Sequence, residues 1–447
     1  MRIDITKPLF AWDCLDDSPD LKTIRHLLQI IPDARLLKAL RAWRGKGRDD
    51  FPVHVLWGVV VLKTLLRHIT YQQILDELKR NPTLAGLIGI PHDRKVPDQW
   101  NVSRFLHVLG RPEHLGLVRE AFNGLVQELG RLVGDLGRKT AGDSTGLSGR
   151  EARSANSADR EVPGPSKARK EYVDDEGNVT KVVEWFGYKL HLLVDVKHEV
   201  ALAYQATSAN VGDNELIPAL VEQAAANLPA GRIETMAYDK AADDQKVHEL
   251  LHERGIAPLV EMRSLWTSEH HRVIPGHEGD NLVHDELGTV YCYDTASEPP
   301  IQHRMAYIGH EKGRGTLKYR CPAMHEGWTC PNHHRCNAGK RYGKTVRVNR
   351  DIDLRRFPPI PRATKKFERL YKGRTAVERV NARLKVFWGA DDGNVTGARR
   401  FHANVSVVML VHAALATLLA ACPRREGTLG RTRLSPIAKA LQEQLRT

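Results

Sequence analysis

Apolar residues recur every three or four positions through roughly the first 135 residues, a spacing that places them on one face of successive α-helices. Thr70 and Gln73 have the spacing of a capping box, which predicts a helix start at Tyr71. The predicted helices cover Leu21–Trp43, Pro52–Arg67, Tyr71–Lys79, a segment after Asp98, and Glu113–Val133. Short helices with basic edges suit either a DNA-end-binding module or a structural or dimerisation bundle.

The pattern then changes to short runs rich in β-branched residues, which predict strands. The expected elements are strands Lys181–Val196 and Glu199–Thr207, a helix from Asp213 to about Asn227, strand Ile233–Tyr238, helix Asp243–Arg254 and strand Ile256–Val260. The first two strands should be antiparallel, and Asp213 is placed to cap the helix that follows them. The last three elements form a βαβ unit, so their strands should be parallel.

Three further stretches depart from this order. Residues 148–178 are polar and predict a mobile loop, with a basic cluster between Lys167 and Lys170. Residues 261–362 contain alternating runs and predict a β-rich insertion. Phe401–Cys422 is long and apolar but contains His, Asn and Ser, which favours a buried core helix over a membrane span.

The charge balance adds a functional hint. The chain of 447 residues carries 67 Lys and Arg against 54 Asp and Glu, a formal net charge of +13. A basic excess favours a polyanionic partner, although basic proteins without one exist. Six cysteines and a start without an apolar secretory segment indicate a reducing cytoplasm and no disulfide framework.

The segment Tyr371–Lys385 reads YKGRTAVERVNARLK and is predicted to form one α-helix. On a helical wheel Tyr371, Arg374, Glu378 and Lys385 fall within a sector of roughly 60°. One carboxylate therefore shares a face with two cations and a phenol, which suits a metal ion beside phosphate. The alternative is an ordinary solvated face with an i,i+4 ion pair.

Two acidic residues upstream are expected at strand ends. Asp143 is followed by Ser144 and Thr145, although an acid before small polar residues can also mark a simple turn. Asp239 follows the strand that ends at Tyr238, and open α/β sheets bind ligands at the carboxyl ends of their strands.

The spacing Y-x2-R-x3-E-x6-K resembles the YREK signature of bacterial insertion-sequence transposases with a DDE catalytic domain. The matching residues are Tyr371, Arg374, Glu378 and Lys385. The segments DST at Asp143, GYKLH at Gly187, TSANVGD at Thr207 and YDKAADD at Tyr238 are similar to further motifs of that family, in the same order. The resemblance extends over roughly residues 50–420.

The resemblance implies an RNase H-like mixed α/β sheet with flanking helices, a β-rich insertion before the glutamate helix, and an all-α N-terminal domain. It implies that Asp143, Asp239 and Glu378 are catalytic and bind two Mg²⁺ ions, which Mn²⁺ can replace. The residues expected to contact DNA are Tyr371, Arg374, Lys385 and Lys240. Water would first nick the transposon end, and the freed 3′-hydroxyl would then attack target DNA.

The implied partners are double-stranded DNA, both as terminal inverted repeats and as target, and a second copy of the chain on DNA. The expected location is the bacterial cytoplasm, at the nucleoid, with no membrane. Two alternatives stay open: a catalytically silent DNA-binding descendant of a transposase, and an RNase H-like nuclease that only hydrolyses.

The expected domains follow from these boundaries. They are residues 1–135, a helical domain for transposon ends; 136–260, the first part of the catalytic core; 261–362, the insertion; 363–423, the second part of the core with the glutamate helix; and 424–447, a basic tail.

The insertion ends in CPAMHEGWTCPNHHRC, where Cys321, Cys330 and Cys336 lie near His333. Soft thiolates and imidazole suit a structural Zn²⁺, with a nearby His or Cys292 as the fourth ligand. The spacings are irregular and contain no CxxC pair, so cysteines without a metal are the alternative.

Overall fold

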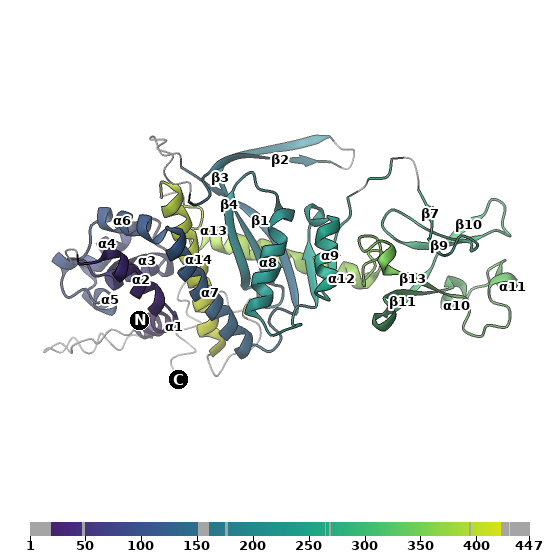
Figure 1. Cartoon of the computed structure of the whole chain (residues 1–447), viewed down its shortest axis with the longest axis horizontal. Coiled ribbons are helices and arrows are strands. Elements are labelled where there is room, and N and C mark those ends of the chain that lie inside the picture. The colour runs from purple at the N-terminus through teal and green to yellow at the C-terminus, as the bar shows by residue number, and fades with distance from the viewer. Residues whose placement is uncertain are drawn as a thin grey trace. The chain divides into compact units, whose positions relative to one another are not determined.

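The computed structural model describes residues 19–46, 50–150, 161–174, 178–263, 265–267, 270–392, 395–421 and 429 (Figure 1). The chain divides into two compact units. The first unit comprises Met1–Arg138, Asp143–Arg232 and Ala376–Thr447, and the second comprises Lys139–Gly142 and Ile233–Thr375. The predicted basic tail lies almost wholly outside the described residues.

The N-terminal part of the first unit is helical, as predicted. Its α-helices are α1 (Pro19–Ile30), α2 (Ala34–Arg44), α3 (Val53–Leu65), α4 (Tyr71–Arg80), α5 (Pro82–Leu87), α6 (Gln99–Leu109) and α7 (Pro112–Leu132). The capping box of Thr70 and Gln73 is confirmed at the start of α4. The stretch predicted as one helix from Leu21 to Trp43 is two helices, because Pro32 lies between them and cannot continue the backbone ladder.

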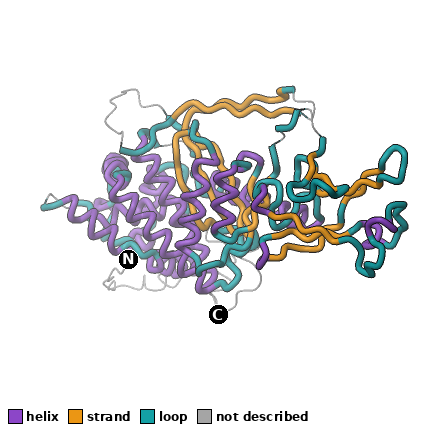
Figure 2. Tube along the Cα trace, turned by 45° about the vertical axis from the view of Figure 1, so that its right-hand side comes forward, coloured by secondary structure: helices purple, strands orange, loops and turns teal. Residues whose placement is uncertain are grey.

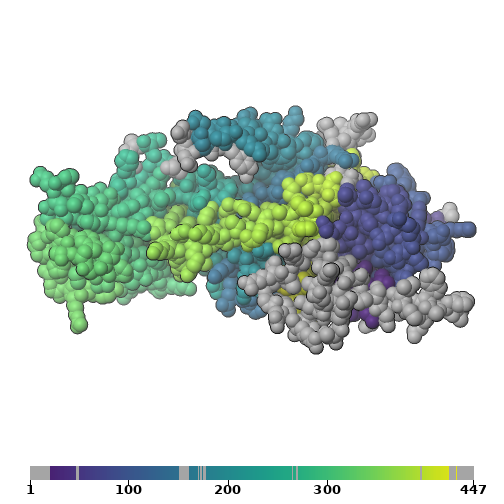
Figure 3. Space-filling view, turned by 180° about the vertical axis from the view of Figure 1, so that it is seen from behind, coloured from purple at the N-terminus to yellow at the C-terminus, as the bar shows by residue number. Residues whose placement is uncertain are grey.

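Helix α14 (Ala398–Ala421) runs through the centre of this unit and packs against α7, α6 and α3. It is long and apolar enough to cross a membrane, but 94% of its apolar window is buried inside the protein. The prediction of a core helix is therefore confirmed. The space-filling view shows the yellow-green surface of the C-terminal helices against the purple-blue surface of the N-terminal ones (Figure 3).

Strand β3 (Val179–Asp195) organises the sheet of the first unit. Its first half pairs antiparallel with β2 (Ser166–Val173), and its second half pairs antiparallel with β4 (Ala201–Ser208). Figure 2 shows β2 and β3 as a long two-stranded ribbon. The prediction that residues 148–178 form a mobile loop is thus wrong for β2, whose backbone groups pair with β3 despite its polar sequence. Residues 151–160 of that loop lie outside the described part of the chain.

Strand β1 (Lys139–Ser148) contributes to both units. Its end lies beside β3, and its start pairs in parallel with β5 (Thr235–Tyr238). Strand β5 pairs in parallel with β6 (Ala257–Val260), and α9 (Gln245–Glu253) connects them, which confirms the βαβ prediction. With α8 (Asp213–Asn227) after β4, the element order is that of the expected RNase H-like fold.

The β-rich insertion is also confirmed. One sheet has the order β10-β9-β8-β7 and the other the order β11-β12-β13. Their bounds are β7 Arg272–Val273, β8 Leu282–His284, β9 Val290–Asp294, β10 Ile301–Arg304, β11 Ala306–Glu311, β12 Thr316–Arg320 and β13 Thr345–Asn349. Between β12 and β13 lie only two short helices, α10 (Pro322–Glu326) and α11 (His333–Cys336).

Candidate active site

Asp143 lies in the middle of β1 and is partly exposed, in contrast to the fully buried Ala141 that precedes it. The expectation that a strand ends at Asp143 is wrong, because β1 continues to Ser148. The cause is the close approach of β3. A Cβ atom at Gly187 would lie only 2.1 Å from the Leu147 carbonyl oxygen, so the glycine of GYKLH lets the two backbones meet.

The residue after Asp143 is held by a polar cluster. The Ser144 hydroxyl lies 2.9 and 2.8 Å from the two carboxylate oxygens of Asp213, and Lys189 Nζ donates to the same carboxylate at 3.2 Å. His191 Nδ1 is 3.6 Å from Asp213, and burial lowers the pKa of His191 to about 4. This cluster fixes the backbone of β1 next to the candidate catalytic acid.

The prediction that Asp213 caps α8 is wrong. The capping position is Gly212, whose backbone N–H donates to Glu215 Oε1 at 3.2 Å, and Asp213 is already inside the first turn. Its carboxylate instead binds Ser144 and Lys189, which satisfies it more fully than one backbone N–H would. Sequence reasoning missed this role, although Lys189 and Asp213 both lie within motifs that it had singled out.

Asp239 immediately follows β5, as predicted. Its Oδ1 accepts the backbone N–H of Ala241 at 2.9 Å, so Asp239 caps a short 3₁₀ helix at Lys240–Ala242. The side chain of Asp239 is partly exposed and that of Lys240 is exposed. The carboxylate therefore keeps oxygen atoms available at the carboxyl end of the strand.

A second acid lies near Asp239. Glu261 follows β6, the parallel neighbour of β5, and accepts a hydrogen bond from Tyr371. Burial, followed by the charge of Glu261 and more weakly that of Asp239, raises the pKa of Tyr371 to about 12. The Arg374 guanidinium lies 6.0 Å from the Tyr371 ring centroid. Sequence reasoning missed Glu261, although it is an acid directly after a predicted parallel strand.

Glu378 lies in the first turn of α13 (Thr375–Val386) and is exposed, whereas the opposite face of α13 is buried. The prediction of one continuous helix from Tyr371 to Lys385 is wrong. Helix α12 (Lys365–Tyr371) is followed by a 3₁₀ turn at Lys372–Arg374, and only then does α13 begin. The turn contains Gly373, whose flexible backbone disfavours a regular helix and tolerates irregular geometry.

Lys385 has partners within the protein. Its Nζ donates to the Gly146 carbonyl at 2.7 Å and lies 3.1 Å from Asp391, which in turn accepts the Ser148 backbone N–H at 2.5 Å. The end of α13 is thereby tied to the end of β1.

The donor chemistry of the three acids fits a hard divalent cation. Asp143, Asp239 and Glu378 offer carboxylate oxygens that are partly or fully exposed, and such oxygens are the ligands that Mg²⁺ prefers. No three His, Cys, Asp or Glu side chains of the described residues already stand in a metal-coordinating arrangement.

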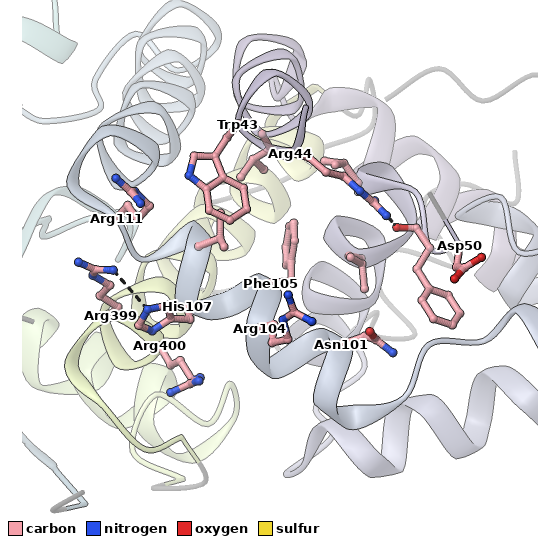
Figure 4. A pocket seen from close by; sticks show the side chains of 15 residues that line it. Trp43, Arg44, Asp50, Asn101, Arg104, Phe105, His107, Arg111, Arg399 and Arg400 are labelled. Carbon is pink, nitrogen blue, oxygen red and sulfur yellow. Dashed lines mark hydrogen bonds between the residues drawn. The ribbon is translucent and has the colours of Figure 1, made fainter. Parts of the chain in front are cut away.

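A separate basic pocket of about 720 Å³ lies in the first unit, between α2, α6 and the start of α14 (Figure 4). Its arginines are Arg44, Arg104, Arg111, Arg399 and Arg400. Arg400 Nε donates to the Ser103 carbonyl at 2.9 Å, and Arg111 lies 6.0 Å from the ring centroid of the half-exposed Trp43. Such a concentration of guanidinium groups suits phosphate.

Arg104 is exposed at this pocket. Among the described residues, Asp50 is the one acid in the pocket lining. Arg399 pairs with Glu161 at 2.9 Å and Arg111 with Glu113 at 2.6 Å. Positive charge therefore exceeds negative charge around the cavity. The sequence indicated the basic edges of these helices but not that Arg399 and Arg400 lie beside them.

Comparison with protein families identifies both parts of the chain. A family model described as "Transposase DDE domain" matches residues 137–414, and one described as "Transposase domain (DUF772)" matches residues 13–108. A search of curated proteins found no match. The first model covers the sheet, the insertion and α13, and the second covers most of the N-terminal helices. The chain belongs to the DDE transposases of insertion sequences, enzymes that cleave DNA and transfer its strands.

Proposed function

We propose that Asp143, Asp239 and Glu378 are the catalytic acids of this transposase. The observation that carries the proposal is the register of β1 and β5, in which Ala141 pairs with Ala237. Asp143 and Asp239 each follow their paired alanine by two residues. Adjacent parallel strands are about 4.8 Å apart, so equivalent positions on them suit acids that share a metal site.

The third acid is supported by its helix. Glu378 lies in the first turn of α13, and Lys385 near the end of this helix is bonded to the Gly146 carbonyl of β1. The three acids would hold two divalent cations, which would be Mg²⁺ or Mn²⁺ in its place. When bound, these ions supply the charge that activates the attacking oxygen and stabilises the leaving 3′ oxygen.

The remaining residues of the signature have different roles. Arg374 and the exposed Lys240 neutralise phosphate next to the acids. Tyr371 donates a hydrogen bond to Glu261, and its pKa of about 12 keeps the phenol neutral well beyond physiological pH. Lys385 positions α13 through its contacts with Gly146 and Asp391. The sequence-based role of Lys385 as a direct phosphate contact is therefore the weaker of the two interpretations.

The catalytic test uses DNA fragments that carry the sequences flanking this reading frame, with Mg²⁺ and labelled 3′ ends. Asp143→Asn, Asp239→Asn and Glu378→Gln should each lose cleavage and joining while retaining DNA binding. Glu368→Gln, which changes an exposed glutamate on α12 paired with Lys372, is the matched control and should remain active. Normal activity in any of the three variants would show that the acid changed in that variant is not catalytic.

The same assay separates the alternatives. Labelled 3′ ends recovered covalently in target DNA exclude a nuclease that only hydrolyses. No cleavage by the wild-type protein with Mg²⁺ or Mn²⁺, despite DNA binding, would favour a catalytically silent descendant. Two ends must be brought together for transposition, so the protein should form a dimer on DNA, which light scattering of the complex measures.

The arginine pocket supports a DNA-binding role for the N-terminal helices. Duplex DNA presents a continuous row of phosphates, and protein contacts to them come mainly from Arg and Lys. Arg104 is the most suitable probe because it is exposed and lines the pocket.

Arg104→Ala should weaken end binding and reduce the salt dependence of log K by about one ion. Arg131→Ala is the control, because Arg131 is similarly exposed but lies outside the pocket. If the pocket were a dimer surface instead, Arg104→Ala would change the oligomeric state and leave DNA binding unchanged.

A further inference from the structure

Four cysteines of the insertion converge on one small cavity. Cys292 lies on β9, Cys321 lies directly after β12, Cys330 lies in the following loop, and Cys336 ends α11. All four line a cavity of about 20 Å³. They are the free cysteines that the described residues contain. The convergence brings Cys292 of β9 together with three cysteines of residues 321–336.

The sulfur atoms receive hydrogen bonds from buried neighbours. Asn337 Nδ2 donates to Cys321 Sγ at 3.5 Å, and the backbone N–H of Asn332 donates to the Cys330 sulfur. Both asparagines are only 3% exposed and line the cavity. The Oδ1 atom of Asn332 has no hydrogen-bond partner in the described part of the chain. Donors aimed at sulfur stabilise the thiolate form, which is the form that binds metal.

The four sulfurs do not stand in a metal-coordinating arrangement. Binding of an ion therefore requires their side chains to move closer together and to release the thiol protons.

The segment around the cysteines contributes little to the hydrophobic core of the insertion. The hydrophobic core shared by the two sheets contains residues such as Leu282, Leu317 and Val348, but none from residues 321–344. That segment has two helices of five and four residues and little apolar burial of its own. Small structures of this kind need a covalent or metal link to hold them in place.

We propose that Cys292, Cys321, Cys330 and Cys336 bind one structural Zn²⁺ that fastens residues 321–344 to the two sheets. Soft sulfur donors in a set of four select zinc over the hard catalytic cations. The sequence left the fourth ligand open between a nearby His and Cys292. His333 is exposed and does not line the cavity, whereas Cys292 does. This site is independent of the proposed catalytic acids.

The first test is metal analysis of the full-length protein purified without chelator. It should contain about one zinc per chain. Cys330→Ser and Cys336→Ser should lose that zinc, and His333→Ala should keep it as the control. Absence of zinc from the wild-type protein, or full retention by either cysteine variant, would overturn the proposal.

A second measurement covers the case in which the cysteine variants fail to fold. The wild-type protein is titrated with a mercurial reagent in the presence of a chromogenic zinc indicator. Zinc should be released in proportion as thiols are modified, and Co²⁺ exchanged into the site should show thiolate charge-transfer absorption. Rapid reaction of all the insertion thiols without metal release would overturn the assignment. Neither readout requires transposition activity.

Discussion

The Lys385 ammonium group donates a hydrogen bond to the Gly146 carbonyl oxygen across 2.7 Å. The same ammonium group lies 3.1 Å from Asp391, whose other oxygen accepts the Ser148 backbone N–H. These contacts join the helix that carries Glu378 to the strand that carries Asp143. The last residue of the YREK-like spacing is therefore bonded within the protein, and its contact with phosphate stays a prediction.

Lys385→Met should reduce strand transfer by about 100-fold, because a misplacement of about 1 Å of a catalytic group has that effect. DNA affinity and its salt dependence should stay nearly unchanged. Lys372→Met, which alters an exposed lysine of the same segment paired with Glu368, should have little effect on either. A loss of about one ion from the salt dependence, with the chemical step intact, would instead indicate a phosphate contact.

Asp213→Asn should destabilise the first unit by about 2 kcal/mol, the range for losing charged hydrogen bonds that are partly buried. The change leaves Lys189 without its carboxylate and weakens the bond to Ser144. Urea unfolding measures the difference. Glu253→Gln, at an exposed position on α9, should change the free energy of unfolding by less than about 0.5 kcal/mol. Equal effects of the two variants would contradict the prediction.

Stability should fall as the pH drops below about 6.5, through His412. Its Nε2 accepts the Ala201 backbone N–H at 3.1 Å, and burial lowers its pKa to about 3. Between about pH 6.5 and pH 3, His412 takes up a proton in the unfolded chain but not in the folded chain. The free energy of unfolding therefore decreases by about 1.4 kcal/mol per pH unit for this group.

Unfolding at pH 7.5 and pH 5.5 tests this effect. His412→Gln should unfold more easily at both pH values but show a smaller difference between them. The exposed His333 provides the control, because His333→Gln should keep the full wild-type difference. An unchanged pH dependence of stability in His412→Gln would show that His412 is not the source of this dependence.

Glu261→Gln should lower the pKa of Tyr371, because the Glu261 charge contributes to raising it to about 12. Ultraviolet difference titration of the variant against wild type should show one tyrosine that ionises at lower pH. Tyr371→Phe combined with Glu261→Gln should remove that difference. If Glu261 also assists Asp239, cleavage by Glu261→Gln will need more Mg²⁺ for half-maximal rate, whereas Asp239→Asn will stay inactive at any concentration.

The sequence alone predicted the elements that depend on neighbouring residues. The capping box at Thr70 is formed by residues three positions apart, and the βαβ unit follows from the spacing of apolar runs. The apolar segment that became α14 contained enough polar residues to indicate a core helix. The order of the transposase motifs was also readable, because each motif is a short continuous segment. Such local signals survive in sequence since their partners are close along the chain.

Other features depended on contacts between distant residues. Asp213 looked like a helix cap until the fold brought Ser144 and Lys189 to its carboxylate. Polar β2 became a strand because β3 supplied its hydrogen-bond partners. Arg399 and His107 of α6 are 292 positions apart in the sequence, yet their side chains are hydrogen-bonded at the pocket. Local propensity carries no information about such distant partners. Burial and hydrogen bonding with them outweigh local propensity, but only once the chain has packed.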